Sequence, residues 1–368
     1  VGTGLIIVLG IYGTTLIQRE GKIVNDIPHD HDLFTSLMLM ENDMGGVMPL
    51  EILVDTRQPR KAKSFGTIRK LSQLSDSLRR FPELAKPMSI ADAAHFAKQG
   101  FYNGDKEYYG MPSMQEMSFI SKYLPKESNA SKDLMGKYID STQQITRMSI
   151  QMKDVGAIRM HTLADSIWTV IREVFPAEKY DITLTGFTML YARGADYLVQ
   201  SMFVSLALAI VLIAGLMAMM FSEWRMVLIS LIPNVIPLLM TGALMGFFHV
   251  PIKPSTVLVF SIAFGISVDN TIHFLAKYRQ ELLVYNGAIR QSVISAIRET
   301  GVSMLYTSII LFSGFSVFAI SDFGGTIALG LLVSFTLFSA LFSNLLILPS
   351  LLLTLEKIIT TKAFSENN

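Results

Sequence analysis

The residue best placed to do chemistry in this sequence is an aspartate inside an apolar run. Asp269 is the one charged residue between positions 254 and 276, and His273 follows four residues later. On a helix this spacing puts both side chains on one face, within reach of a shared hydrogen bond or proton. An ionisable group at membrane depth is costly, so it should face the bundle interior and have a partner. Because a low dielectric favours the neutral acid, this carboxyl group suits reversible protonation, with a buried structural hydrogen-bond pair as the alternative.

Hydroxyl groups on a later apolar run are the expected partners of this pair. The run carries Tyr306, Thr307 and Ser308, all polar residues among apolar neighbours. In a membrane such side chains hydrogen-bond across helices. Gly265 lies four residues before Asp269 on the same helical face, where its missing side chain lets a neighbouring helix or water approach. The sequence therefore predicts a proton relay of Asp269, His273, Asn270, Tyr306 and Thr307, with Gly265 as a helix-packing position.

Other catalytic and cofactor-binding patterns are absent from the sequence. It contains no G-x-x-x-x-G-K-[ST], H-E-x-x-H or G-x-S-x-G motif. His29 and His31 lie between carboxylates in residues 28–32 (PHDHD), a polar loop of a kind that is more often solvated than metal-binding. The absence of cysteine excludes disulfides, thiol catalysis and cysteine-ligated metal centres. We therefore expect a protein that is not an enzyme and that holds no metal or cofactor.

The elements that position Asp269 are predicted to be membrane-spanning helices. Of the 368 residues, 51% are hydrophobic and 17% charged, whereas a soluble domain is nearer a quarter charged. The net charge of +1 argues against nucleic-acid binding. Crossing a bilayer takes about 20 apolar residues. Six stretches carry at most one Asp, Glu, Lys or Arg: 1–18, 199–222, 226–252, 254–276, 300–321 and 323–355.

The predicted architecture is an α-helical membrane bundle of six transmembrane helices. The first helix covers 1–17 and is expected to be truncated at its start, because the chain opens at Val1 inside an apolar run. The other five form a bundle over 198–357, followed by a cytosolic tail at 358–368. Lysines and arginines concentrate after the second, fourth and sixth spans, which puts both termini and an interfacial segment at about 278–299 in the cytosol. The composition fits a bacterial inner membrane.

Residues 18–197 are predicted to form an α+β ectodomain between the first and second helices, on the periplasmic side. Residues 50–55 (LEILVD) suit a buried strand. Polar and apolar residues alternate over 147–153, which suits a strand with one solvent-exposed face. Strand periodicity also marks Ile182 and Leu184. Two apolar stripes have helical spacing: Ile68, Leu71, Leu74, Leu78 and Phe81, then Met160, Leu163, Ile167, Val170 and Val174. This order predicts helices on one face of a small sheet, with 84–140 unassigned.

The stretch FGISVDNTIHFLAKYR (264–279) resembles the G-x-x-x-D element of the resistance–nodulation–division (RND) superfamily. The similarity is closest to the branch that holds MMPL-type lipid exporters, hopanoid transporters and Patched-like sterol-sensing proteins. Five further segments resemble family elements in the same order: ENDMGGVMPLEILVD (41–55), TGFTMLYARGADYLVQS (185–201), RMVLISLIPNVIPLLMTGALMGF (225–247), AIRQSVISAIRETGVSMLYTSIILFSGF (288–315) and LFSNLLILPSLL (341–352). Residues 41–55 resemble the opening strand of the family's porter domain, and residues 185–201 resemble the segment that leaves that domain and enters the membrane.

The resemblance implies proton-driven export of a lipid or other hydrophobic molecule by one six-helix half, the C-terminal one, of a two-half transporter. By the same resemblance, the chain is expected to interact with membrane lipids and with a hydrophobic substrate. Its expected protein partners are the other six-helix half of the transporter and either further copies in an oligomer or a periplasmic protein. Two departures matter: Asn270 stands where many MMPL-type members have tyrosine, and the lysine that drug pumps carry on the tenth span is absent. The alternatives are a non-transporting sterol- or lipid-sensing protein and a proton-driven accessory subunit of protein export.

Overall fold

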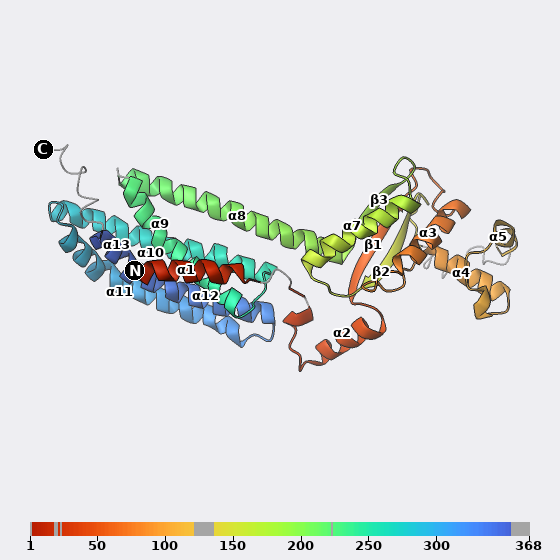
Figure 1. Ribbon diagram of the computed structural model, residues 1–368, viewed down its shortest axis with the longest axis horizontal. Helices are drawn as coiled ribbons and strands as arrows, with labels where there is room; N and C mark the ends of the chain where they lie inside the picture. Colours follow the sequence, from red (N-terminus) through yellow and green to blue (C-terminus); the bar gives the residue numbers. More distant parts are fainter. Residues whose placement is uncertain (1, 18–20, 23, 121–135, 222–223, 355–368) are drawn as a thin grey trace. The chain divides into compact units, whose positions relative to one another are not determined.

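The fold is given by a computed structural model, which describes residues 2–17, 21–22, 24–120, 136–221 and 224–354 (Figure 1). The chain divides into two units that we describe separately. The helical unit comprises residues 1–21, 25–28 and 195–368, and the sheet unit comprises 22–24 and 29–194.

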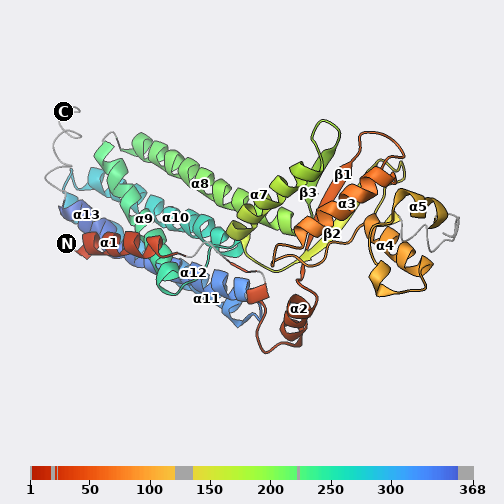
Figure 2. The ribbon, with the colours of Figure 1, turned by 45° about the vertical axis from the view of Figure 1, so that its right-hand side comes forward.

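The sheet unit is built on a three-stranded antiparallel sheet in the order β2-β1-β3 (Figures 1 and 2). Strand β1 spans Met48–Asp55, β2 Ile145–Met152 and β3 Asp181–Thr185. In the register, Ile52 lies opposite Met148 on one side and Leu184 on the other. Every second residue of β1 is buried, which is the pattern of a sheet with one covered face. The three predicted strands are confirmed.

Helices α3 (Phe65–Leu78) and α7 (Ala157–Val174) cover the buried face of this sheet. Leu71, Leu74 and Ile167 are completely buried there, so both predicted helical stripes form the core. Ser64 caps α3, because its hydroxyl accepts a hydrogen bond from the Thr67 amide. The remaining helices of the unit are α2 (Asp32–Asp43), α4 (Ile90–Phe101), the 3₁₀ turn η2 (Lys106–Tyr108) and α5 (Met114–Ile120).

A buried histidine joins α4 to α3. The His95 Nε2 lies 3.0 Å from the Ser72 hydroxyl, whereas the buried Nδ1 has no hydrogen-bond partner among the described residues. Burial away from water disfavours the charged imidazolium, so the pKa of His95 is lowered from its usual value despite the nearby Asp92. The folded sheet unit therefore binds this proton less readily than the unfolded chain does.

We expect the sheet unit to lose stability as the pH falls from 7.5 to 5.5. The unfolded histidine takes up its proton near pH 6.5, so His95 stabilises the fold above that value and ceases to do so below it, by up to about 1.4 kcal/mol per pH unit. Denaturant unfolding of the full chain in detergent measures this through Trp168, after Trp224→Phe removes the second of the two tryptophans. His95→Gln should flatten the pH dependence. An unchanged slope in that variant would contradict the assignment.

The helical unit contains long apolar helices. Within the described ranges, five are long and apolar enough to cross a membrane: Phe187–Met220, Arg225–Phe247, Pro254–Val284, Ile289–Ile320 and Gly324–Thr354. They correspond to α8 (Phe187–Met220), α9 (Trp224–Phe247), α10 (Pro254–Val284), α11 (Ile289–Ser316) with the 3₁₀ turn η3 (Val317–Ile320), and α12 (Gly324–Phe342) continued by a π-helix (Ser343–Ile347) and α13 (Leu348–Thr354). The shorter α1 (Gly2–Thr15) is also apolar. The sixth span stays a prediction.

Helices α1 and α9 approach each other at glycines. A Cβ atom added at Gly13 would lie 2.5 Å from the Cα of Ala243, and one added at Gly246 would lie 1.8 Å from the Gly13 carbonyl oxygen. Gly242 and Gly246 form a G-x-x-x-G motif, which lets helix backbones pack closely in a membrane. Close contact between the backbones of α1 and α9 at these glycines therefore packs α1 against the bundle.

A buried ion pair fixes the segment after α1 to the ends of two bundle helices. The Lys253 Nζ lies 2.6 Å from the Asp26 Oδ1, with side chains 9% and 14% exposed. Lys253 directly precedes α10, and Asp26, in the 3₁₀ turn η1 (Val24–Asp26), also contacts Gly324 at the start of α12. The pair thus ties residue 26 to the point where α10 and α12 begin.

Lys253→Met is expected to destabilise the helical unit by about 3–5 kcal/mol, because it leaves the Asp26 carboxylate buried without its partner. Asp26→Asn in the same chain should recover part of the loss, since the remaining amide carries no charge. Thermal unfolding of both single variants and the double variant in detergent measures this coupling. Additive losses in the double variant would contradict an energetic link between the two side chains.

Candidate functional site

A cavity that is open to the surface lies between α10 and α11 in the helical unit. Its volume is about 400 Å³, and both polar and apolar side chains line it. Helix α10 contributes Asp269, Asn270, His273, Ala276, Lys277 and Gln280, and α11 contributes Glu299, Thr300, Ser303, Met304 and Thr307. The spacing of three and four residues on each helix explains why these side chains share one face.

The predicted pair of Asp269 and His273 opens onto this cavity. The Asp269 Oδ1 lies 3.4 Å from the His273 Nε2, and the two side chains are 70% and 72% exposed. The sequence places them toward the bundle interior, whereas in this chain they face outward from its own helices. The opposite face of α10 is the buried one, where Phe274 and Tyr278 pack. Both side chains are therefore accessible from the cavity.

The other polar residues singled out from the sequence, Asn270 on α10 and Tyr306, Thr307 and Ser308 on α11, do not all reach the cavity. Asn270 and Thr307 line the cavity with Asp269, whereas Tyr306 and Ser308 do not. The Tyr306 side chain is 63% exposed, and Ser308 is buried against the bundle. Gly265 also has open space beside it, because an added Cβ atom would meet no atom of the described chain within 4 Å. No described residue therefore packs against Gly265, and its predicted role in helix packing stays a prediction.

One end of the cavity holds a charged cluster that the sequence analysis does not anticipate. The Lys277 Nζ lies 2.8 Å from the Glu281 Oε1 and 2.6 Å from the Glu299 Oε2. One ammonium group thus bridges two turns of α10 and reaches across to α11. The two helices form a hairpin here, with Asn286 and Gly287 in left-handed conformations between them. The segment predicted to be interfacial, 278–299, therefore consists of the end of α10, this turn and the start of α11.

A buried polar network holds the other face of α10 in place. Asn234 of α9 accepts hydrogen bonds through its Oδ1 from the hydroxyls of Ser267 (3.0 Å) and Thr271 (2.8 Å). Thr271 is also 2.7 Å from the Asn344 Oδ1. These side chains are at most 1% exposed, and satisfied polar groups of this kind fix a unique helix arrangement. The network sets the rotation of α10 and so turns Asp269 toward the cavity.

Proline explains why the π-helix Ser343–Ile347 lies next to α9. Pro237 has no amide hydrogen, so the carbonyl of Pro233 loses its partner within α9. The Ser343 hydroxyl donates to that carbonyl at 2.7 Å. In membrane helices, Ser and Thr side chains of a neighbouring helix can bond a carbonyl that a proline leaves free. The prolines therefore create an interhelical contact as well as a kink.

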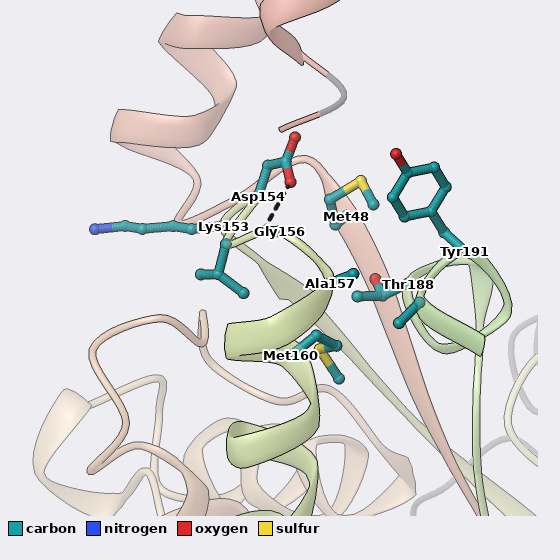
Figure 3. A pocket seen from close by; sticks show the side chains of 10 residues that line it. Met48, Lys153, Asp154, Gly156, Ala157, Met160, Thr188 and Tyr191 are labelled. Atoms are coloured by element: carbon teal, nitrogen blue, oxygen red, sulfur yellow. Dashed lines mark hydrogen bonds between the residues drawn. The ribbon is translucent and has the colours of Figure 1, made fainter. Parts of the chain in front are cut away.

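A second cavity lies in the sheet unit, beside the N-terminus of α7 (Figure 3). It has room for about one water molecule, at about 10 Å³. The buried Asp154 carboxylate beside it accepts hydrogen bonds from the amides of Val24 (3.1 Å) and Gly156 (3.4 Å). The carboxylate thus caps backbone amides, and the cavity is too small for a substrate.

The two histidines in residues 28–32 belong to the start of α2. The His31 Nδ1 accepts a hydrogen bond from the Leu33 amide at 3.1 Å and so acts as the helix cap. The His29 ring stacks on Phe34, with ring centroids 4.4 Å apart. Both rings therefore have structural roles within the described chain.

Two known sequence groups resemble this chain. The family model of the MMPL family matches residues 59–363, which include the cavity and most of the sheet unit. The chain is also similar to the protein MJ1562 of Methanocaldococcus jannaschii, which is named as a membrane protein. The two are 19% identical over 372 residues, an alignment that covers 96% of this chain and 89% of that protein.

Proposed function

This chain belongs to the MMPL family of the RND superfamily, and from that premise we propose that it is an exporter of a lipid or other hydrophobic molecule driven by the proton-motive force. It is a multi-pass membrane protein, in keeping with its apolar helices. We place it in the bacterial inner membrane, with the sheet unit as a porter-like domain in the periplasm. It carries out transport rather than catalysis.

The observation that carries the proposal is a titratable pair on an apolar helix beside a polar cavity. Asp269 and His273 lie within one candidate membrane span and open onto a space of about 400 Å³. Water and hydroxyl groups in such a space can relay protons. An ionisable side chain at membrane depth is costly, so its presence there indicates a functional role. The side chains of Asn270 and Thr307 supply further hydrogen-bonding groups at the cavity wall.

The exposed face around Asp269 needs a protein partner within the membrane. A carboxyl group that is 70% exposed on this chain would otherwise meet hydrocarbon, at a cost of several kcal/mol. We propose that the other six-helix half of the transporter covers it, whether that half lies on the same polypeptide or on a second copy. Gly265, with open space beside it, is then a position where the second half approaches α10.

The alternative functions differ in what they require of Asp269. A sterol- or lipid-sensing protein binds a lipid without moving it, so it needs no exchangeable proton in the bundle. A proton-driven accessory subunit of protein export needs the proton but no lipid cargo. The proposed exporter requires both, and these requirements separate the three functions experimentally.

Lipid analysis tests the proposal. The lipids of the outer layer and of the cytoplasmic membrane are compared by mass spectrometry in a wild-type strain, a strain deleted for the full gene and the complemented deletion. An exporter predicts that one lipid class falls in the outer layer, accumulates in the cytoplasmic membrane and recovers on complementation. Unchanged lipid distribution with a changed level of a secreted protein would favour the export subunit, and no change in either would favour the sensor.

A further inference from the structure

Helix α2 carries an apolar stripe that the rest of the described sheet unit leaves largely exposed. Leu33, Leu37 and Met40 recur at a spacing of three or four residues and so share one face of the helix, and Met44, the C-cap residue, continues this spacing. Leu33, Met40 and Met44 are 50%, 41% and 61% exposed, and α2 buries none of its residues. Figures 1 and 2 show α2 apart from the sheet and from α3 and α7 of the same unit. The stripe therefore contributes nothing to the core of the sheet unit.

The chain keeps α2 close to the membrane surface. The buried ion pair with Lys253 fixes Asp26 where the candidate spans Pro254–Val284 and Gly324–Thr354 begin. Helix α2 starts at Asp32, six residues further along the chain. A fully extended segment of that length spans at most about 20 Å, and the headgroup layer on each side of a bilayer is roughly 5–8 Å deep. The start of α2 thus remains within reach of the leaflet at that end of the helical unit.

We propose that α2 lies in the membrane interface, with the stripe of Leu33, Leu37, Met40 and Met44 inserted into the leaflet at the end of the helical unit where α10 and α12 begin. An amphipathic helix in this position buries its apolar face about 5–10 Å into the boundary between headgroups and acyl chains. The occupant of the stripe is lipid, because the stripe is exposed and a short segment tethers α2 to Asp26, where two candidate membrane spans begin.

The charges of α2 specify the kind of lipid surface. The helix contains Asp32, Glu41 and Asp43 and no basic residue, so anionic headgroups repel it. Insertion of the apolar side chains alone must therefore hold α2 at the membrane. We expect α2 to bind zwitterionic lipid, whose headgroups carry no net charge, more strongly than anionic lipid. The contact makes α2 an anchor that fixes the entry of the sheet unit at the leaflet, in addition to the proposed transport.

Site-directed labelling tests this proposal without relying on transport. The chain has no cysteine, so Leu37→Cys and Met40→Cys each provide a single attachment point on the stripe, and Thr35→Cys and Asn42→Cys provide matched points on the opposite face of α2. Each full-length variant is labelled with a small environment-sensitive fluorophore and reconstituted in phosphatidylcholine nanodiscs. Brominated phosphatidylcholine then quenches from the lipid, and iodide quenches from water.

The proposal predicts that brominated lipid strongly quenches the labels at 37 and 40, whereas iodide quenches mainly those at 35 and 42. Replacing part of the phosphatidylcholine by phosphatidylglycerol should weaken the lipid quenching or leave it unchanged. Iodide quenching that is equal at all four positions would overturn the proposal. So would stripe labels shielded from both quenchers, which would identify protein as the occupant, or lipid quenching that rises with anionic lipid.

Discussion

Asp269→Asn is expected to reduce export to the level of a strain that lacks the gene. Asparagine keeps the size and the hydrogen bonding of the side chain but cannot take up and release a proton. If transport is driven by protonation at the cavity between α10 and α11, the cycle then has no proton to exchange with His273, 3.4 Å away. The measurement is the amount of the affected lipid class in the outer layer of the complemented deletion strain.

Two further variants make the Asp269 result specific. Asp322→Asn removes an exposed carboxylate from the connection between η3 and α12 of the same unit, and it should leave export unchanged. Asp269→Glu keeps a titratable group and should retain part of the activity. Equal amounts of each protein in the membrane must be verified by immunoblot. Full export by the Asn variant would remove Asp269 from the mechanism and favour the sensor or scaffold alternatives.

Gly246→Ile is expected to displace α1 from α9. Even a single Cβ atom at this position would lie 1.8 Å from the Gly13 carbonyl oxygen, which is a backbone atom and cannot rotate away. Overpacking costs about 1–3 kcal/mol where side chains can adjust, and a contact with backbone belongs at the upper end of this range or above it. The packing of α1 is therefore expected to fail while the other helices keep their contacts.

Disulfide formation between the two helices measures this displacement. Gly10→Cys and Leu239→Cys place two Cβ atoms close together, since a Cβ at Gly10 would lie 3.0 Å from that of Leu239. Oxidation should cross-link this pair in an otherwise cysteine-free chain, and adding Gly246→Ile should abolish the cross-link. Gly314→Ile is the matched control, because its Cβ would meet open space. Cross-linking that survives Gly246→Ile would contradict the described packing of α1.

The sheet unit could largely be predicted because its periodicities are local. Alternation in β1 and β2 and the stripes of α3 and α7 each reflect one covered face, which a single segment already reveals. The region between α3 and β2 has no such regularity. There, Met88 and Leu84 pair with β2 through isolated bridges, contacts that depend on residues more than 60 positions away. Local sequence does not encode such pairings.

The membrane site was only partly predictable, because hydropathy does not define which face of a helix is buried. The sequence identifies Asp269 and His273 as a pair, but it places them toward the bundle interior. The direction is set by Asn234, Thr271 and Asn344, whose hydrogen bonds connect three segments far apart in the chain. A signal was present, since two asparagines in charge-free apolar runs are themselves unusual. The G-x-x-x-G motif at Gly242 and Gly246 was another signal.

Proton uptake by the purified protein tests the central claim most directly. The full-length protein is reconstituted in liposomes that enclose a pH-sensitive dye, a pH gradient is imposed, and the lipid class identified in the deletion strain is added. The account predicts proton flux that depends on this lipid in the wild type and falls to the level of empty liposomes with Asp269→Asn. Equal, lipid-dependent flux in both proteins would contradict a proton pathway through Asp269.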